Sequence, residues 1–333
     1  MPLLVAFFCF HLLFLHPVAI AEAFSVAMSQ GGEECGSIPL RAGFIGCGTI
    51  ASAIASSLAS PEHARHLADG AGVSLESISV TRRSEARSSA LAAAFPGVVT
   101  VCGTPAEVVA SSDLVFLCVL PQHADGVLDE VRGEWDGKRH TLVSLVSTSS
   151  VSGLVTATGL DGGRVYKMIC LPAIEKREGC ALLQPAAGAD PDACPGGSVN
   201  VRRLLDSLGG CVVCPDDEAM NTMMVTTAMM GPLYGMMRNN REWLVARGIS
   251  ASDAGYFVSR SYLSMVQDAE RSCREAKRLD ELVAEQTPGG LNEQALGNLA
   301  EQGVFGAFDN AMDAVLSRLE GKSDGSLPPS GDK

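Results

Sequence analysis

The chain has 333 residues, with 25 Lys and Arg against 38 Asp and Glu, and a formal net charge of −13. Its hydrophobic fraction of 47% is enough for a buried core, which excludes wholesale disorder, and its length suggests two domains. The acidic balance argues against nucleic-acid binding but leaves room for a local basic pocket. The six histidines all lie at or before His140, and they and the eleven scattered cysteines show no metal-ligand spacing, so no metal site is expected.

Residues 1–23 are predicted to be a leader rather than part of the fold. An apolar run is followed by Ala21-Glu22-Ala23, the small residues that a signal peptidase prefers, so cleavage is expected before Phe24. His11 and Pro17 interrupt the run, which argues against a membrane anchor, and no stable membrane insertion is expected after leader removal. The leader predicts the secretory pathway. Because Phe follows the cut, it also resembles signal-plus-transit leaders of secondary plastids, which is the alternative.

A strand is predicted over residues 41–46, followed by a glycine-rich turn and a helix that extends to about Leu58. The turn, Gly46-Cys47-Gly48-Thr49-Ile50-Ala51, has the pattern GxGxxA. Its first glycine permits a tight turn, its second permits close approach of a pyrophosphate, and the helix N-terminus presents free N–H groups. Gly46, Cys47, Gly48, Thr49 and Ile50 are therefore predicted to bind a dinucleotide, although a turn without ligand is the simpler alternative.

The next predicted strand, residues 77–81, runs into Arg82-Arg83-Ser84. An NAD site usually has Asp or Glu at this point to bind the ribose 2′-hydroxyl. Two cations and a hydroxyl instead suit the 2′-phosphate of NADP(H). Arg82, Arg83 and Ser84 are therefore predicted to bind that phosphate; the alternative is a solvated pair of arginines at a helix start.

Strands and helices continue to alternate along the chain. Strands are predicted at 98–101, 113–119 and 141–146, with helices between them. This order predicts an α/β fold with a Rossmann-type doubly wound parallel sheet. Val119, Leu120 and Pro121 follow a strand whose carboxyl end should line the cofactor crevice, so they are predicted to contact the cofactor through backbone groups, unless this is a plain turn.

Beyond residue 215 the pattern becomes helical. A helix is predicted over 217–247 with a kink at Gly231-Pro232, one long helix with an apolar stripe over 250–285, and further helix over 291–319. The stripe is larger than one neighbouring helix would cover, which predicts a homodimer or a larger homo-oligomer. The predicted domains are a leader (1–23), a linker (24–40), an NADP-binding Rossmann domain (41–214), a helical dimerisation and substrate domain (215–320) and a disordered tail (321–333).

Thr287-Pro288-Gly289-Gly290 separates two of the predicted helices. A Pro-Gly-Gly turn before a helix presents backbone N–H groups at a positive helix end, which would suit a carboxylate. Taken alone, this tripeptide favours a simple interhelical turn.

Four motifs together resemble the pyrroline-5-carboxylate reductase family, in the right order over roughly residues 41–320. The first two are Gly43-Phe44-Ile45-Gly46-Cys47-Gly48, similar to the family's first strand and phosphate loop, and Phe116-Leu117-Cys118-Val119-Leu120-Pro121-Gln122. The others are Gly231-Pro232-Leu233-Tyr234, similar to the opening of a dimerisation helix, and the Thr287–Gly290 turn, similar to a substrate loop. The resemblance implies a Rossmann domain followed by an all-helical domain that dimerises.

The resemblance also implies NADPH-dependent reduction of a small cyclic imino acid, 1-pyrroline-5-carboxylate to proline, as in proline biosynthesis. Gly289 and Gly290 would hold the substrate carboxylate, with Thr287 and Asn292 as catalytic residues. Where the family has two threonines after Pro-Gly-Gly, this chain has Leu291 and Asn292. Because hydride transfer needs no protein nucleophile, cofactor binding withstands such changes better than substrate identity. A reductase of another imine or carbonyl, or a non-catalytic NADP-binding protein, are the alternatives.

Overall fold

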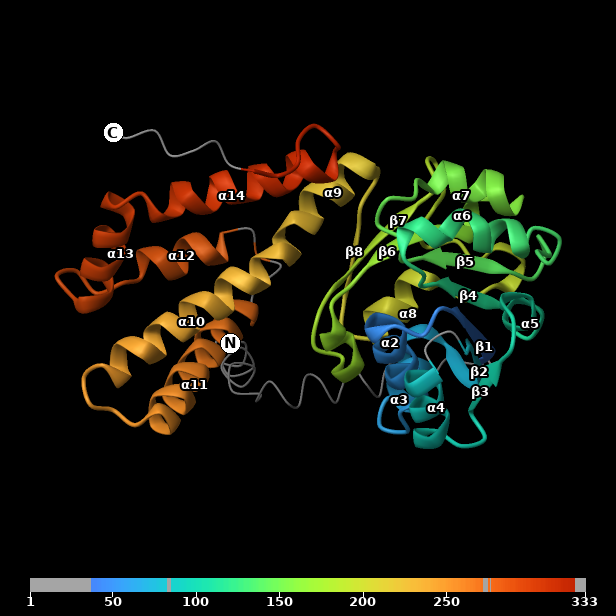
Figure 1. The fold of residues 1–333 in the computed structure, drawn as a ribbon, viewed down its shortest axis with the longest axis horizontal. Helices are drawn as coiled ribbons and strands as arrows, with labels where there is room; N and C mark the ends of the chain where they lie inside the picture. Colours follow the sequence, from blue (N-terminus) through green and yellow to red (C-terminus); the bar gives the residue numbers. More distant parts are fainter. Residues whose placement is uncertain (1–36, 83–84, 272–274, 276, 327–333) are drawn as a thin grey trace, which may run out of the picture.

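The structure is a computed structural model that describes residues 37–82, 85–271, 275 and 277–326. The predicted leader (1–23), most of the linker (24–40) and the end of the predicted tail lie outside the described residues. The described part divides visibly into a sheet with helices on it and a region made only of helices (Figure 1).

The sheet has eight strands in the order β3-β2-β1-β4-β5-β6-β7-β8. The strands are β1 (Ile38–Ile45), β2 (Val73–Thr81), β3 (Val99–Cys102), β4 (Leu114–Leu117), β5 (Thr141–Ser144), β6 (Val165–Ile169), β7 (Ala181–Pro185) and β8 (Cys211–Val213). Neighbouring strands pair in parallel except for β6 and β7, which pair antiparallel. The predicted Rossmann-type fold class is confirmed, with this one reversal added to the parallel sheet.

Helices cover both faces of the sheet because each strand presents apolar side chains to both sides. One face packs against α2 (Thr49–Ala59), α4 (Glu85–Ala94) and α8 (Val201–Ser207), with the short α3 (Ala64–His66) leading into the π-helix η1 (Leu67–Ala71). The other face packs against α5 (Pro105–Ala110), α6 (Pro121–Glu130) and α7 (Val151–Thr158). Phe44 of β1 and Phe116 of β4 stack with ring centroids 4.8 Å apart at the centre of the first core.

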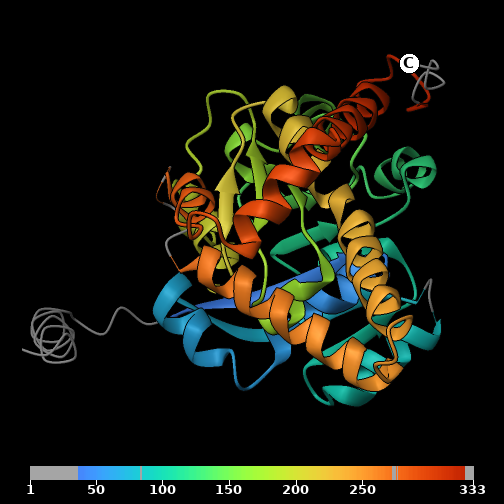
Figure 2. The same ribbon diagram turned by 90° about the vertical axis from the view of Figure 1, so that its left-hand side faces the viewer.

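The remaining helices form a separate region. They are α9 (Asp217–Val225), α10 (Met230–Val245), α11 (Ala251–Glu270), α12 (Arg278–Ala284), α13 (Leu291–Glu301) and α14 (Val304–Leu319). Cys214, Met220 and Met224 pack with Leu182 of β7 and so join α9 to the sheet. Viewed with the helical side toward the reader, α10 to α14 lie in front of the sheet domain (Figure 2). No helix in the described part of the chain is long and apolar enough to cross a membrane.

Two helix predictions need correction. The 3-10 turn η5 (Thr226–Met229) separates α9 from α10, so the break precedes Gly231-Pro232, which lies in the first turn of α10, where proline's missing N–H costs nothing. The single helix predicted over 250–285 is wrong: α11 ends at Glu270 and α12 begins at Arg278. Arg278 pairs with Asp268 at 3.7 Å, whereas ten residues of continuous helix would separate them by about 15 Å.

Candidate functional site

The glycine-rich turn joins β1 to α2 as the pattern predicted. Gly46 has a φ of 102°, and a Cβ there would lie 2.5 Å from the carbonyl oxygen of Cys118, so only glycine fits. Its N–H donates to Thr81 Oγ1 at 2.8 Å, which ties the turn to the end of β2. Gly48 caps α2 without a side-chain hydrogen bond, and nothing lies within 4 Å of where its Cβ would be. The first turn of α2 therefore presents backbone N–H groups to open space, as a pyrophosphate requires.

A cavity of about 220 Å³ lies beside this turn, at the carboxyl ends of β1, β4, β5 and β6. Its lining residues are Gly48, Thr49, Ile50, Ala51, Cys118, Val119, Leu145, Met168, Ile169 and Cys170. Of the predicted cofactor residues, Gly48, Thr49, Ile50 and Val119 thus meet at one cavity. The others adjoin it differently: Cys47 is buried with its Sγ 3.6 Å from Ser52 Oγ, and Leu120 and Pro121 are exposed at the start of α6.

The basic end of the site contains a residue that the motif did not indicate. Arg82 directly follows β2 and is exposed, whereas Arg83 and Ser84 lie outside the described residues. Arg87, in the first turn of α4, donates to Thr49 Oγ1 and so lies against the start of α2. Both guanidinium groups can serve an anionic part of a dinucleotide that runs from α2 toward the end of β2. The sequence could have indicated Arg87, because this residue lies one helical turn after Ser84, the last of the predicted phosphate-binding residues.

The two thiols that line this cavity, those of Cys118 and Cys170, have raised pKa values. Burial raises the pKa of Cys170 to about 12, and burial with the neighbouring Cys170 and Cys47 raises that of Cys118 well above its ordinary value. The thiolate is the reactive form of cysteine, so at neutral pH these two side chains act as small apolar walls.

A second, larger cavity of about 700 Å³ opens between the loop that follows β5 and the helices α9 and α14. Lys167 of β6, only 3% exposed, points its ammonium group toward Asp217 of α9 at 3.4 Å. Asn221 and Arg318 line the same space. Neither Lys167 nor Asp217 was predicted as a site residue, because the ion pair joins positions fifty residues apart.

The predicted substrate residues lie elsewhere in the chain. Thr287, Gly289, Gly290 and Asn292 form the turn between α12 and α13 and the first turn of α13, at the end of the helical region remote from the sheet (Figure 1). One chain therefore does not bring them to the cofactor cavity. Within the turn, the Gly290 N–H donates to Thr287 O at 2.8 Å and the Gly289 N–H donates to Glu293 Oε2 at 2.7 Å. A carboxylate does bind this turn, but it is the chain's own.

Comparison with known proteins agrees with this geometry. Residues 41–148 match the family described as NADP oxidoreductase, coenzyme F420-dependent. A pyrroline-5-carboxylate reductase of Corynebacterium melassecola is 26% identical over 280 residues, which cover 83% of this chain and 96% of that protein.

Solved structures show the same fold. A pyrroline-5-carboxylate reductase from Coxiella burnetii superposes with a TM-score of 0.68 at 18% identity, covering 85% of this chain and 98% of that one. The Plasmodium falciparum pyrroline carboxylate reductase, solved with NADP bound, gives 0.64 at 15% identity, covering 86% and 98%.

Fold and family model together define an oxidoreductase of the NADP-dependent class. The chain is similar in sequence and in fold to pyrroline-5-carboxylate reductases, which confirms the resemblance inferred from its motifs. NADP(H), the predicted cofactor, agrees with that class. The open N-terminus of α2, the neighbouring cavity and the adjacent Arg82 and Arg87 fit such a dinucleotide.

Proposed function

We propose that the protein uses NADPH to reduce a small cyclic imino acid, with 1-pyrroline-5-carboxylate as the first candidate. The observation that carries this proposal is the cavity at the start of α2, which has a phosphate-binding turn at one end and an apolar wall at the other. The similarity to a pyrroline-5-carboxylate reductase over 83% of the chain supports the choice of substrate.

The walls of the cavity set the conditions for the reaction. A bound nicotinamide supplies the hydride. Ile50, Val119 and Leu145 give that ring a surface that excludes water, while the first turn of α2 anchors the phosphates. Among the described residues that line the cavity, Cys118 and Cys170 are the only ones that titrate, and both stay protonated. The proton is therefore expected to arrive with a protonated imine or from solvent.

We infer that a second copy of the chain completes the site. The described residues of α10, α12, α13 and α14 include no buried residue, although large apolar side chains such as Tyr256, Phe257 and Met265 of the neighbouring α11 are exposed. Apolar surface of this extent marks an interface. A partner docked on this surface would also bring Thr287, Gly289, Gly290 and Asn292 near a bound cofactor. Within one chain these residues lie far from the cofactor cavity.

The chemistry of the Thr287–Asn292 turn keeps a second candidate open, a reductase of another imine or of a carbonyl. Leu291 and Asn292 stand where the family has two threonine hydroxyls, and the Glu293 carboxylate accepts the hydrogen bond of the Gly289 N–H. A substrate carboxylate would have to displace Glu293, whereas a cationic imine without a carboxylate would be attracted by it.

NADPH oxidation, followed at 340 nm with 1-pyrroline-5-carboxylate and with a panel of cyclic imines and 2-oxo acids, tests these proposals. Turnover of the first compound supports the first proposal. Turnover of other panel members without turnover of 1-pyrroline-5-carboxylate supports the second candidate, a reductase of another imine or of a carbonyl. Normal NADPH binding without any turnover would identify a non-catalytic NADP-binding protein and sink both.

We propose further that the chain enters the secretory pathway and is cut before Phe24, with import into a plastid as the alternative. The apolar run before Ala21-Glu22-Ala23 supports the cut. N-terminal sequencing of protein purified from its natural source should begin at Phe24, and a chain that begins at Met1 would contradict the leader.

A further inference from the structure

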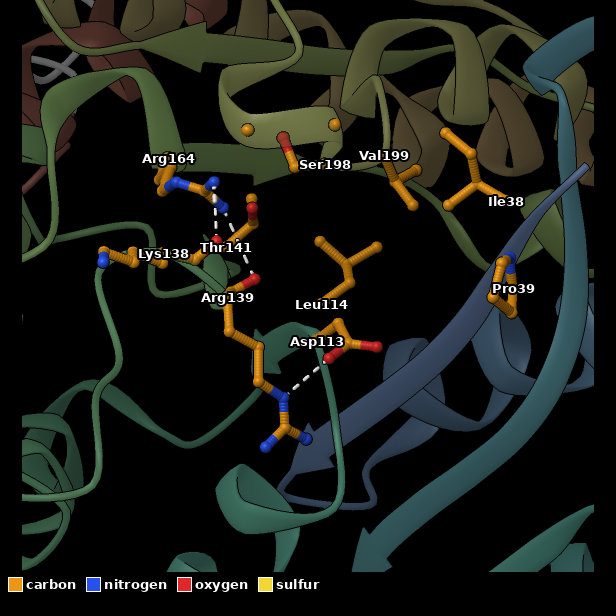
Figure 3. A pocket seen from close by; sticks show the side chains of 12 residues that line it. Ile38, Pro39, Asp113, Leu114, Lys138, Arg139, Thr141, Arg164, Ser198 and Val199 are labelled. Atoms are coloured by element: carbon orange, nitrogen blue, oxygen red, sulfur yellow. Dashed lines mark hydrogen bonds and ion pairs between the residues drawn. The ribbon is translucent and has the colours of Figure 1, made fainter.

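A third cavity lies at the edge of the sheet opposite to the cofactor. It has a volume of about 300 Å³, at the lower end of the range for small-molecule pockets. Residues at the amino ends of the strands line it, among them Pro39 of β1, Leu114 of β4 and Thr141 of β5, together with the loop Gly196–Val199 (Figure 3). Since the cofactor cavity lies at the carboxyl ends of the same strands, the two cavities are separate.

A buried cation forms one end of this cavity. Arg164 is 3% exposed, and no carboxylate lies within ion-pair distance of it among the described residues. Its guanidinium donates to the carbonyl oxygens of Lys138 (2.9 Å) and Pro195, and more weakly to those of Arg139 and His140, both at 3.4 Å. Carbonyl dipoles compensate a buried charge less well than an anion does.

Two hydroxyls adjoin this cation. Thr141 is 3% exposed, and its Oγ1 is buried without a hydrogen-bond partner in the described structure. An unpaired buried hydroxyl is costly, and a ligand oxygen in the cavity would satisfy it. Figure 3 shows Thr141 beside the Arg164 guanidinium and Ser198 on the adjoining wall. Ser198 belongs to the loop Gly196–Val199, and it is half-buried.

The rest of the wall is mostly apolar. Ile38, Pro39, Leu114 and Val199 face the cavity from the side away from Arg164 (Figure 3). Asp113 is the one carboxylate among the lining residues. It is bound by Arg41 and by Arg139, each at 2.7 Å, so this cluster carries net positive charge and does not oppose an anion.

We propose that this cavity is a second ligand site, which binds a small monocarboxylate with an apolar body. The carboxylate would lie against the positive charge of Arg164 and accept hydrogen bonds from Thr141 and Ser198, while the body would lie on Leu114 and Val199. Neither a bare phosphate nor a neutral apolar molecule matches both ends of the cavity. The proposal concerns a site apart from the cofactor, and it stands whether or not the reductase assignment holds.

Isobutyrate is the probe that tests the proposal, measured by saturation-transfer NMR on the full chain with saturating NADPH. We expect binding that persists with NADPH, and isobutyramide, which has the same shape without charge, should bind at least about tenfold more weakly. Thr141→Val should weaken isobutyrate binding by about five- to tenfold while leaving or raising the melting temperature, because it removes an unpaired hydroxyl. A purely structural threonine would change stability without changing binding.

Arg164→Met should abolish binding, and Arg65→Met, at an exposed arginine, is the matched control that should not alter it. Isobutyrate binding that NADPH abolishes, or that Thr141→Val leaves unchanged, would overturn the proposal.

Discussion

At the residue scale, we expect the cofactor preference to depend on Arg82 and Arg87, the arginines around the start of α2. Arg82→Ala and Arg87→Ala should each raise the Kd for NADPH about tenfold and change that for NADH little, because a 2′-phosphate loses a charge-assisted hydrogen bond that a hydroxyl never made. Fluorescence titration with both nucleotides measures this. The double variant Arg82→Ala/Arg83→Ala extends the test to the other predicted cation, and Arg65→Met is the control. Equal weakening of both nucleotides would refute the 2′-phosphate assignment.

The thiol of Cys170 provides a pH-dependent prediction. Burial raises its pKa to about 12, so the neutral thiol predominates until the solution is strongly alkaline. We expect its alkylation by iodoacetamide to be slow at pH 8 and to accelerate about tenfold per pH unit through pH 10. Mass spectrometry of the labelled peptides, with the exposed Cys194 as internal reference, measures the rate. A rate that levels off near pH 9 would show an ordinary thiol.

Glu293 yields a prediction about the substrate. Glu293→Gln removes the charge that occupies the Gly289 N–H and keeps the shape of the side chain. If a substrate carboxylate binds there, KM for 1-pyrroline-5-carboxylate should fall several-fold while that for an imine without a carboxylate should rise. The matched control is Glu301→Gln, at the end of the same helix. Unchanged KM values for both substrates would exclude the turn from carboxylate binding.

At the element scale, local chemistry made much of the first half predictable. The turn at Gly46 needs a positive φ, and the apolar strands around it alternate with helices, so β1 to β5 and the helices α2, α4, α5 and α6 follow from the sequence. β6 and β7 were not predicted, because Lys167 and Gln184 interrupt their apolar runs. Both side chains are buried, and Lys167 is paired with Asp217. Such compensation between distant positions is invisible in a local pattern.

The same reason limits the prediction of sites. The GxGxxA turn revealed the cofactor cavity because its function resides in consecutive residues. Arg164 has no comparable motif: its partners are carbonyl oxygens on loops some thirty residues away. The break between α11 and α12 was also missed, because an apolar spacing that continues across a bend resembles one helix.

At the scale of the whole molecule, the exposed helical face predicts assembly. We expect light scattering after gel filtration to give at least twice the chain mass. Tyr256→Ser/Phe257→Ser, at side chains 72% and 66% exposed in one chain, should shift the protein to monomer while leaving NADPH binding measurable. Leu120→Ser, at an exposed leucine of the sheet domain, is the control and should keep the assembly. A wild-type chain that elutes as a monomer would contradict the proposed interface.

Buried residues are concentrated around the sheet, and this distribution affects how the protein folds and assembles. The two cores that flank the sheet are complete within residues 40–211, so this part can fold as a single chain, at a rate independent of protein concentration. The described helices after α9 have few buried residues of their own, and the proposed second copy would cover them. Their ordering should therefore be a bimolecular step that is slow in dilute solution, and their melting temperature should rise with protein concentration while that of the sheet stays constant.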